Sequence, residues 1–145
     1  MNSTTLASWA PRVLSVLRIV TALLFLEHGL MKLIGFPAPI PGVPHPLPLL
    51  LQLAMWLETI GPPLLLIGLF TRPVAFLLSG EMAVAYFMAH APRGPYPALN
   101  MGEPAALYCF IFLFLFFAGP GPWSVDAQLN KTAADSFAAR KAAAP

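Results

Sequence analysis

Three glutamates, Glu27, Glu58 and Glu81, lie within long apolar stretches of the sequence. An ionised carboxylate that faces lipid costs about 2.5 to 3.5 kcal/mol on membrane-insertion scales. Counted from the expected outer ends of their stretches, the three lie at one depth, roughly 10 to 17 Å below the surface at about 1.5 Å per residue. We expect three separate helices to bring these carboxyl groups into one layer. If all three face the protein interior and not lipid, the free-energy cost of placing them in the membrane is lowered.

Carboxyl groups gathered in a lipid-shielded layer can take up and release protons, and they can pass protons to a lipid-soluble redox carrier. We predict Glu58, Glu81 and Glu27 as candidate catalytic residues on this basis. A structural alternative stays open, in which the acids pair with basic side chains or hydrogen-bond to one another and only lock the helices together.

Four basic or imidazole side chains are candidates for binding a substrate: Arg18, His28, Lys32 and His90. Lys32 or His28 would donate a hydrogen bond to a quinone oxygen. Periodicity does not place all of these groups in one contiguous site. Glu27 points almost opposite Arg18, and His90 lies opposite Glu81 on an ideal helix.

Cysteine and histidine spacing gives no sign of a metal or haem centre. The sequence has one cysteine, Cys109, which excludes an intrachain disulfide, a CxxC redox pair and a cysteine zinc site. The two histidines His28 and His90 lie on separate helices, and no CxxCH motif accompanies them. We therefore expect no metal site, and a quinone is the only cofactor class that the residues suggest.

The elements that must position these residues are membrane helices. Of 145 residues, 58% are hydrophobic and only 10% are charged, whereas an average soluble domain has about 25% charged residues. The mean hydropathy is +0.74. A net charge of +2 with no basic stripe argues against binding to nucleic acid. The composition indicates a small integral membrane protein with one domain.

Four stretches are close to the roughly 20 apolar residues that cross about 30 Å of hydrocarbon. We expect spans at about 13–34, 47–70, 73–91 and 99–119, joined by irregular connectors over 35–48 and 92–102. Backbone groups inside lipid must bond within their own helix. The predicted fold is an all-α, membrane-embedded antiparallel four-helix bundle over residues 1–124, followed by a cytoplasmic tail over 125–145.

Basic residues near the helix ends set the expected orientation. The side with six of them carries Arg12, Arg18, Arg72, Lys131, Arg140 and Lys141, and the other side carries Lys32 and Arg93. Both termini are therefore expected in the cytoplasm.

Five loose motifs, in order, make the chain similar to the DoxX family of small four-helix membrane proteins. They are Arg18 with His28-Gly29 and Lys32-Leu33; Leu57–Gly61 with Gly68-Leu69 and Thr71-Arg72; Met82 with Ala85; Asn100 with Glu103; and Gly119, Gly121, Ser124–Asp126 and Leu129. Two features depart from the family pattern: Pro62-Pro63 in the second span and the additional carboxylate Glu81.

The resemblance implies a multi-pass protein of the bacterial cytoplasmic (inner) membrane with quinone-linked redox work, since related subunits belong to a thiosulfate:quinone oxidoreductase. We expect a subunit of a quinone-linked membrane oxidoreductase. The alternative is a non-catalytic accessory subunit that stabilises a larger membrane complex. The expected partners are the lipid bilayer and either such a complex or further copies of the chain, with no nucleic acid.

Overall fold

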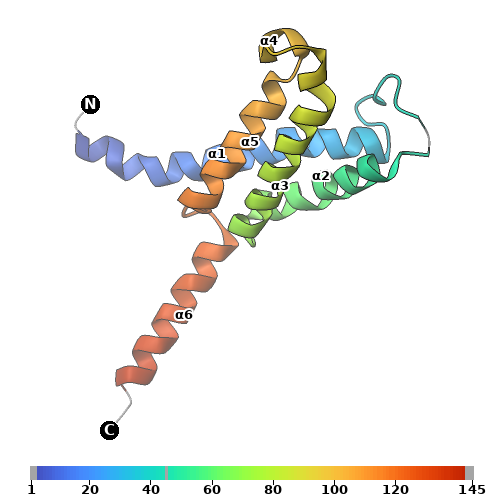
Figure 1. Ribbon diagram of the computed structural model, residues 1–145. Helices are drawn as coiled ribbons and strands as arrows, with labels where there is room; N and C mark the ends of the chain where they lie inside the picture. Colours follow the sequence, from blue (N-terminus) through green and yellow to red (C-terminus); the bar gives the residue numbers. More distant parts are fainter. Residues whose placement is uncertain (1–2, 45, 143–145) are drawn as a thin grey trace.

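The computed structural model describes residues 3–44 and 46–142, and every regular element in them is helical. The all-α class is therefore confirmed. A π-helical turn, η1 (Tyr86–His90), and a 3-10 turn, η2 (Ala91–Arg93), continue the third helix. The α-helices, drawn in Figure 1, are α1 (Ser3–Leu33), α2 (Leu49–Ile67), α3 (Thr71–Ala85), α4 (Pro97–Asn100), α5 (Glu103–Ala118) and α6 (Val125–Ala142).

Three helices are long and apolar enough to cross a membrane. They are Thr4–Leu33 within α1, Leu49–Ile67 (α2), and α3 with its extension to Arg93, of 30, 19 and 23 residues. The helix α5 is strongly apolar but has 16 residues. At about 1.5 Å per residue it is roughly 24 Å long, which is shorter than the hydrocarbon layer of about 30 Å.

The helix ends differ from the expected spans for local backbone reasons. α2 ends at Ile67 because Gly68 adopts a left-handed conformation (φ 70°) and closes the helix with hydrogen bonds to its last carbonyls. α5 begins at Glu103, four residues later than expected, because Met101 (φ 59°) turns the chain between α4 and α5. α1 begins ten residues before the expected span, and Pro11 lies inside it.

The helices pair two by two, α1 with α2 and α3 with α5, and α2 also contacts α3. In Figure 1 the first pair runs across the second instead of lying parallel to it. The buried core lies where the two pairs meet, and it contains Ala22, Phe25, Leu65, Leu78, Met82, Phe112 and Leu115.

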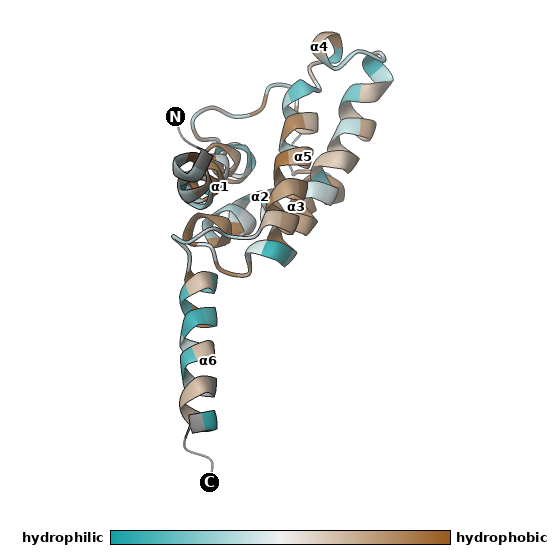
Figure 2. Ribbon diagram, turned by 90° about the vertical axis from the view of Figure 1, so that its left-hand side faces the viewer, coloured by the Kyte–Doolittle hydropathy of each residue, from teal (hydrophilic) through white to brown (hydrophobic). Residues whose placement is uncertain are grey.

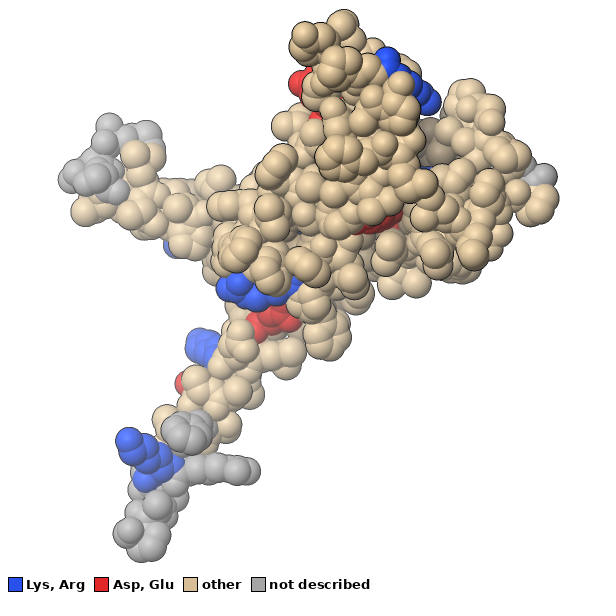
Figure 3. Space-filling view, in the orientation of Figure 1, with Lys and Arg blue, Asp and Glu red and all other residues tan. Residues whose placement is uncertain are grey.

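The last helix, α6, extends away from the others (Figure 1). In Figure 2, α3 and α5 are mostly hydrophobic in colour, whereas α6 alternates between polar and apolar residues. Charged side chains gather near the start of α6 and are sparse elsewhere on the face seen in Figure 3. The described part of the tail is thus a polar helix that projects from an apolar body.

Candidate functional site

Lys32 of α1 and Glu58 of α2 form a buried ion pair. The ammonium donates a hydrogen bond to Glu58 Oε2, and the two side chains are 10% and 4% exposed. Lys32 Nζ also lies 3.4 Å from the carbonyl oxygen of His28. The two helices approach closely here because Gly29 packs on the backbone of Glu58. Small residues mark such close contacts between membrane helices.

Glu81 of α3 completes a cluster with this pair. Both carboxylate oxygens of Glu81 are enclosed, and neither has a hydrogen-bond partner among the described residues. Glu58 and Lys32 are the charged groups that interact electrostatically with Glu81. Three helices thus bring together two carboxyl groups and one ammonium, which we call the Lys32–Glu58–Glu81 cluster. Its members were all predicted from the sequence.

A small cavity of about 10 Å³ lies beside Lys32, under the connector between α1 and α2. Its other lining residues are Met31, Ile40, Val43 and Leu47. A space of this size holds about one water molecule. It can therefore admit water toward the cluster, but it is too small for the ring of a quinone.

Glu27 lies outside the cluster, so the expected layer of three carboxylates is wrong in this respect. Its side chain is exposed on α1, and its charge acts on Tyr108 of α5. The physical reason is helical geometry. Glu27 and Lys32 are five residues apart, which separates them by about 140° around the helix. Because Lys32 turns toward α2, Glu27 turns away from it.

His28 lies in an aromatic group between α1 and α5. Its ring centroid is 5.5 Å from that of Phe25 and 5.7 Å from that of Tyr108, and Phe25 and Phe112 are fully buried. Ring atom Nδ1 of His28 is enclosed without a hydrogen-bond partner among the residues the structure covers. Tyr108 was missed by the sequence analysis, although it is the one tyrosine in α5 among many phenylalanines.

Arg18 was expected to bind substrate, but its guanidinium is hydrogen-bonded to backbone carbonyls of the same chain. It is fully buried. Its guanidinium donates to Pro120 O (2.8 Å), Leu66 O (2.7 Å) and Trp123 O (2.5 Å), and also to Leu65 O. These carbonyls lie at the end of α2 and in the loop before α6. Arg18 therefore joins two distant segments, and this use leaves little of it for a ligand.

His90 ends η1, beside the loop that leads to α4, and its contacts are made within that region. Its Nδ1 atom is 3.1 Å from the carbonyl oxygen of Asn100, and its ring stacks with Tyr86. The Asn100 side chain is buried and bonds to Gly94 O and Gly102 N. Within the described residues, His90 makes no hydrogen bond to the Lys32–Glu58–Glu81 cluster.

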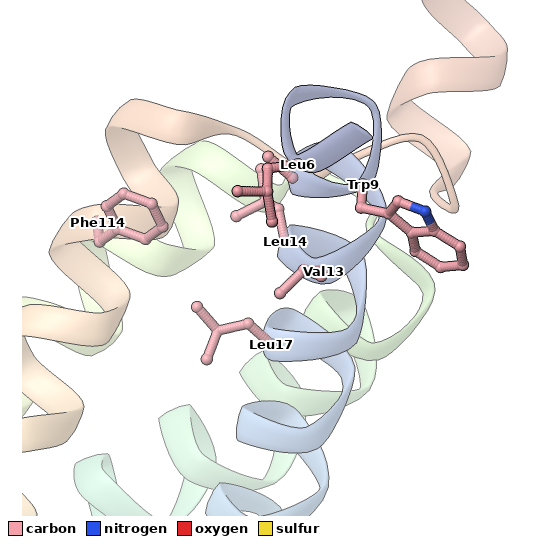
Figure 4. Close-up of a pocket in the computed structure, with 7 residues that line it drawn as sticks. Leu6, Trp9, Val13, Leu14, Leu17 and Phe114 are labelled. Carbon is pink, nitrogen blue, oxygen red and sulfur yellow. The ribbon is translucent and has the colours of Figure 1, made fainter. Parts of the chain in front are cut away.

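An open apolar groove of about 340 Å³ follows the first half of α1 where it diverges from α5. In Figure 4, Leu14 and Leu17 point toward Phe114 across this groove. Leu6, Trp9, Ala10 and Val13 complete its lining. No polar group of these side chains converges on it, so its surface suits hydrocarbon.

Long apolar helices that share a buried ion pair are typical of a multi-pass helical membrane protein. A sequence model of the DoxX family matches residues 13–91, which include all of the Lys32–Glu58–Glu81 cluster. The chain therefore belongs to the DoxX family, as its motifs indicate.

Two relatives with curated sequences illustrate the family. An uncharacterised protein of Haemophilus influenzae is 42% identical over 133 residues, covering 87% of this chain and 97% of that protein. The inner membrane protein YqjF of Escherichia coli is 28% identical over 132 residues, covering 80% of this chain and 91% of YqjF. No solved structure matches the chain. With its apolar helices, this kinship makes the chain a multi-pass inner-membrane protein.

Proposed function

We propose that the chain is a membrane subunit of a quinone-linked oxidoreductase system, in which the Lys32–Glu58–Glu81 cluster handles protons. The observation that supports this proposal is the enclosed carboxyl group of Glu81 beside the Lys32–Glu58 ion pair. Reduction of a quinone consumes electrons and protons in equal number. The electrons come from a redox-active partner subunit, and this chain supplies the route for protons.

Charge balance explains how the cluster can hold a proton. Burying an ion without a counter-ion is costly, and one ammonium balances only one carboxylate. The cluster therefore has a place for one proton, shared by Glu58 and Glu81. Lys32 stabilises whichever carboxyl group is ionised, and the small cavity beside Lys32 offers a water contact toward the outer side.

The same proposal includes the arrangement in the membrane. The helix α5 packs along α3, and we take it as a fourth crossing beside α1, α2 and α3, with local thinning of the bilayer to fit its length. We thus propose a membrane-embedded bundle of four helices over residues 1–124, in which the α1–α2 pair is inclined to the α3–α5 pair (Figure 1). Both termini, including the polar helix α6, then lie in the cytoplasm, in agreement with the distribution of basic residues.

Glutamine substitutions test the proton role directly. A tagged chain is purified from native membranes with the subunits that accompany it. Reduction of decylubiquinone, with reduced benzyl viologen as the electron donor to those subunits, is measured after subtraction of the protein-free rate. We expect Glu58→Gln and Glu81→Gln each to lower the rate at least tenfold, whereas Glu103→Gln, at an exposed position at the start of α5, leaves it unchanged. Equal rates in all three variants would refute the proposal.

A second candidate function, that of a non-catalytic accessory subunit, is favoured by one observation. The projecting helix α6 makes few contacts with the rest of the chain, as expected of a segment that docks on another protein or on a further copy. In that case removal of residues 128–145 dissociates the complex, while Glu58→Gln leaves the activity of the assembled complex unchanged. The two functions thus predict opposite results for Glu58→Gln in the assembled complex.

A further inference from the structure

We propose that His28 and Tyr108, with Glu27 beside them, form a hydrogen-bonding site for a quinone headgroup where α1 meets α5. This site is separate from the Lys32–Glu58–Glu81 cluster. It rests on the proposed function and adds to it the place where the quinone ring binds. Tyr108 and the α5 side of the site have no counterpart in the residues predicted from the sequence.

The tautomer of His28 follows from its surroundings. Its Nδ1 atom is enclosed without a partner. An enclosed N–H group that lacks an acceptor loses its bond to water without compensation, so the neutral ring keeps its proton on the other nitrogen. That nitrogen, Nε2, is not enclosed. His28 therefore presents an N–H donor away from the protein interior.

Tyr108 supplies a second donor on a ring adjacent to that of His28. The rings of His28 and Tyr108 lie 5.7 Å apart at 81° to each other. The hydroxyl group of Tyr108 has no hydrogen-bond partner in the part of the chain that the structure describes, and it is not enclosed. Two free donors on adjacent rings, within an apolar layer, are arranged to meet a ligand that carries acceptor oxygens.

Buried phenylalanines hold the two donors in place. Phe25 lies 5.0 Å from Tyr108 and 4.9 Å from Phe112, and both phenylalanines are fully buried. Tyr108 also stacks with Phe112. A site whose side chains are fixed by packing loses little conformational freedom when a ligand binds. The aromatic surroundings also suit a flat ring.

The charge of Glu27 narrows the class of ligand. This carboxylate is exposed on α1 and interacts electrostatically with Tyr108. Its negative charge would repel an anionic headgroup bound there. A cationic headgroup would be attracted to Glu27, but it would leave the His28 and Tyr108 donors without an acceptor. A neutral, flat molecule with carbonyl oxygens satisfies the donors without opposing Glu27, and a quinone is the lipid-soluble carrier with these properties.

His28 also connects the two sites. Its carbonyl oxygen lies 3.4 Å from Lys32 Nζ, and Lys32 pairs with Glu58. One residue thus faces the headgroup site with its ring and the proton-handling cluster with its backbone. A quinone bound at His28 and Tyr108 would lie close to the groups that we propose to handle its protons.

Direct binding of decylubiquinone tests the site. The purified protein, with its accompanying subunits, is placed in nanodiscs of phosphatidylcholine and titrated by calorimetry. Loss of one neutral hydrogen bond typically weakens binding by about five- to tenfold. We expect this effect for Tyr108→Phe and for His28→Phe, which keep an aromatic ring, and a larger loss for the double variant. Tyr96→Phe, at an exposed position in the outer loop, serves as the matched control with unchanged affinity.

The outcomes separate this inference from the proposed function. If Tyr108→Phe and His28→Phe melt like the parent protein and bind decylubiquinone equally well, the headgroup site is wrong. A tenfold loss of turnover in Glu58→Gln would then still support the proton-handling cluster. If the parent protein binds no decylubiquinone, both the site and the quinone-linked function are overturned.

Discussion

Gly29 of α1 lies directly against the backbone of Glu58 in α2. A methyl group at position 29 would stand 2.6 Å from the Glu58 carbonyl carbon and oxygen, and 2.7 Å from Thr59 Oγ1. These distances are closer than side-chain atoms and backbone can approach. The contact brings the two helices together one turn before Lys32, so the ion pair between Lys32 and Glu58 depends on the absence of a side chain at Gly29.

Replacement of this glycine should separate α1 from α2. We expect Gly29→Ala to lower the free energy of unfolding by about 1 to 3 kcal/mol, as overpacking does. Gly80→Ala is the matched control, because a methyl group there meets no atom within 4 Å. It should be neutral or stabilising by up to about 1 kcal/mol. Unfolding in SDS, followed by circular dichroism, measures both, and equal stability of the two variants would contradict the close contact.

The ion pair itself predicts a pattern across three variants. Removal of one partner of a buried pair leaves an uncompensated charge and costs about 3 to 5 kcal/mol, whereas replacement of both by apolar groups is often tolerated. We therefore expect Lys32→Met to destabilise the protein more than the double variant Lys32→Met with Glu58→Leu. The same SDS titration gives the comparison. Additive losses in the double variant would show that the two side chains do not interact in the membrane.

Much of the cluster was predictable from the sequence because helical periodicity is a local property. The spacing of Glu58, Gly61 and Leu65 puts them on one face of a helix, and all three are buried. Glu27 does not join the cluster, because a residue count fixes depth in the membrane but does not show which face of α1 packs on α2. Lys32 and Glu27 cannot both face α2, and only the structure shows that Lys32 does so.

The role of Arg18 could not be predicted in the same way. Its acceptors lie 47 to 105 residues away along the chain, at Leu65, Leu66, Pro120 and Trp123. All four are backbone carbonyls, which carry no signature of their own in a sequence. A buried arginine that bonds only to carbonyls resembles, in sequence, an arginine that binds a ligand.

Arg18 should therefore act on stability and not on quinone affinity. We expect Arg18→Lys to lower the free energy of unfolding by several kcal/mol, because one ammonium cannot reproduce the planar fork that reaches separate carbonyls. Hydrogen exchange should rise in the loop 119–124. Arg12→Lys is the control, since Arg12 is exposed and its one side-chain hydrogen bond among the described residues goes to Ser8 O in the same helix. If Arg18→Lys leaves the hydrogen-exchange protection of the loop unchanged, this role for Arg18 is wrong.

Asp126 holds the start of α3 from a distant part of the chain. Its two carboxylate oxygens accept hydrogen bonds from the backbone N–H groups of Phe70 and Thr71, each at 2.9 Å. A carboxylate at a helix N-terminus satisfies free donors and favours the helix dipole. Because Asp126 lies in the first turn of α6, this contact also fixes the point at which the tail leaves the membrane helices.

Loss of this cap should destabilise the junction between α3 and α6, and two substitutions at Asp126 should do so to different degrees. We expect Asp126→Ala to cost about 0.5 to 2 kcal/mol, the usual range for a helix cap, and Asp126→Asn to cost less, since its amide oxygen can still accept one bond. Asp135→Ala, at an exposed position in the middle of α6, leaves the cap intact and should be neutral. Hydrogen exchange at the backbone N–H groups of Phe70 and Thr71, which Asp126 caps, reports local opening of the junction. Equal exchange rates in Asp126→Ala and Asp135→Ala would show that α3 does not need the tail to begin at Thr71.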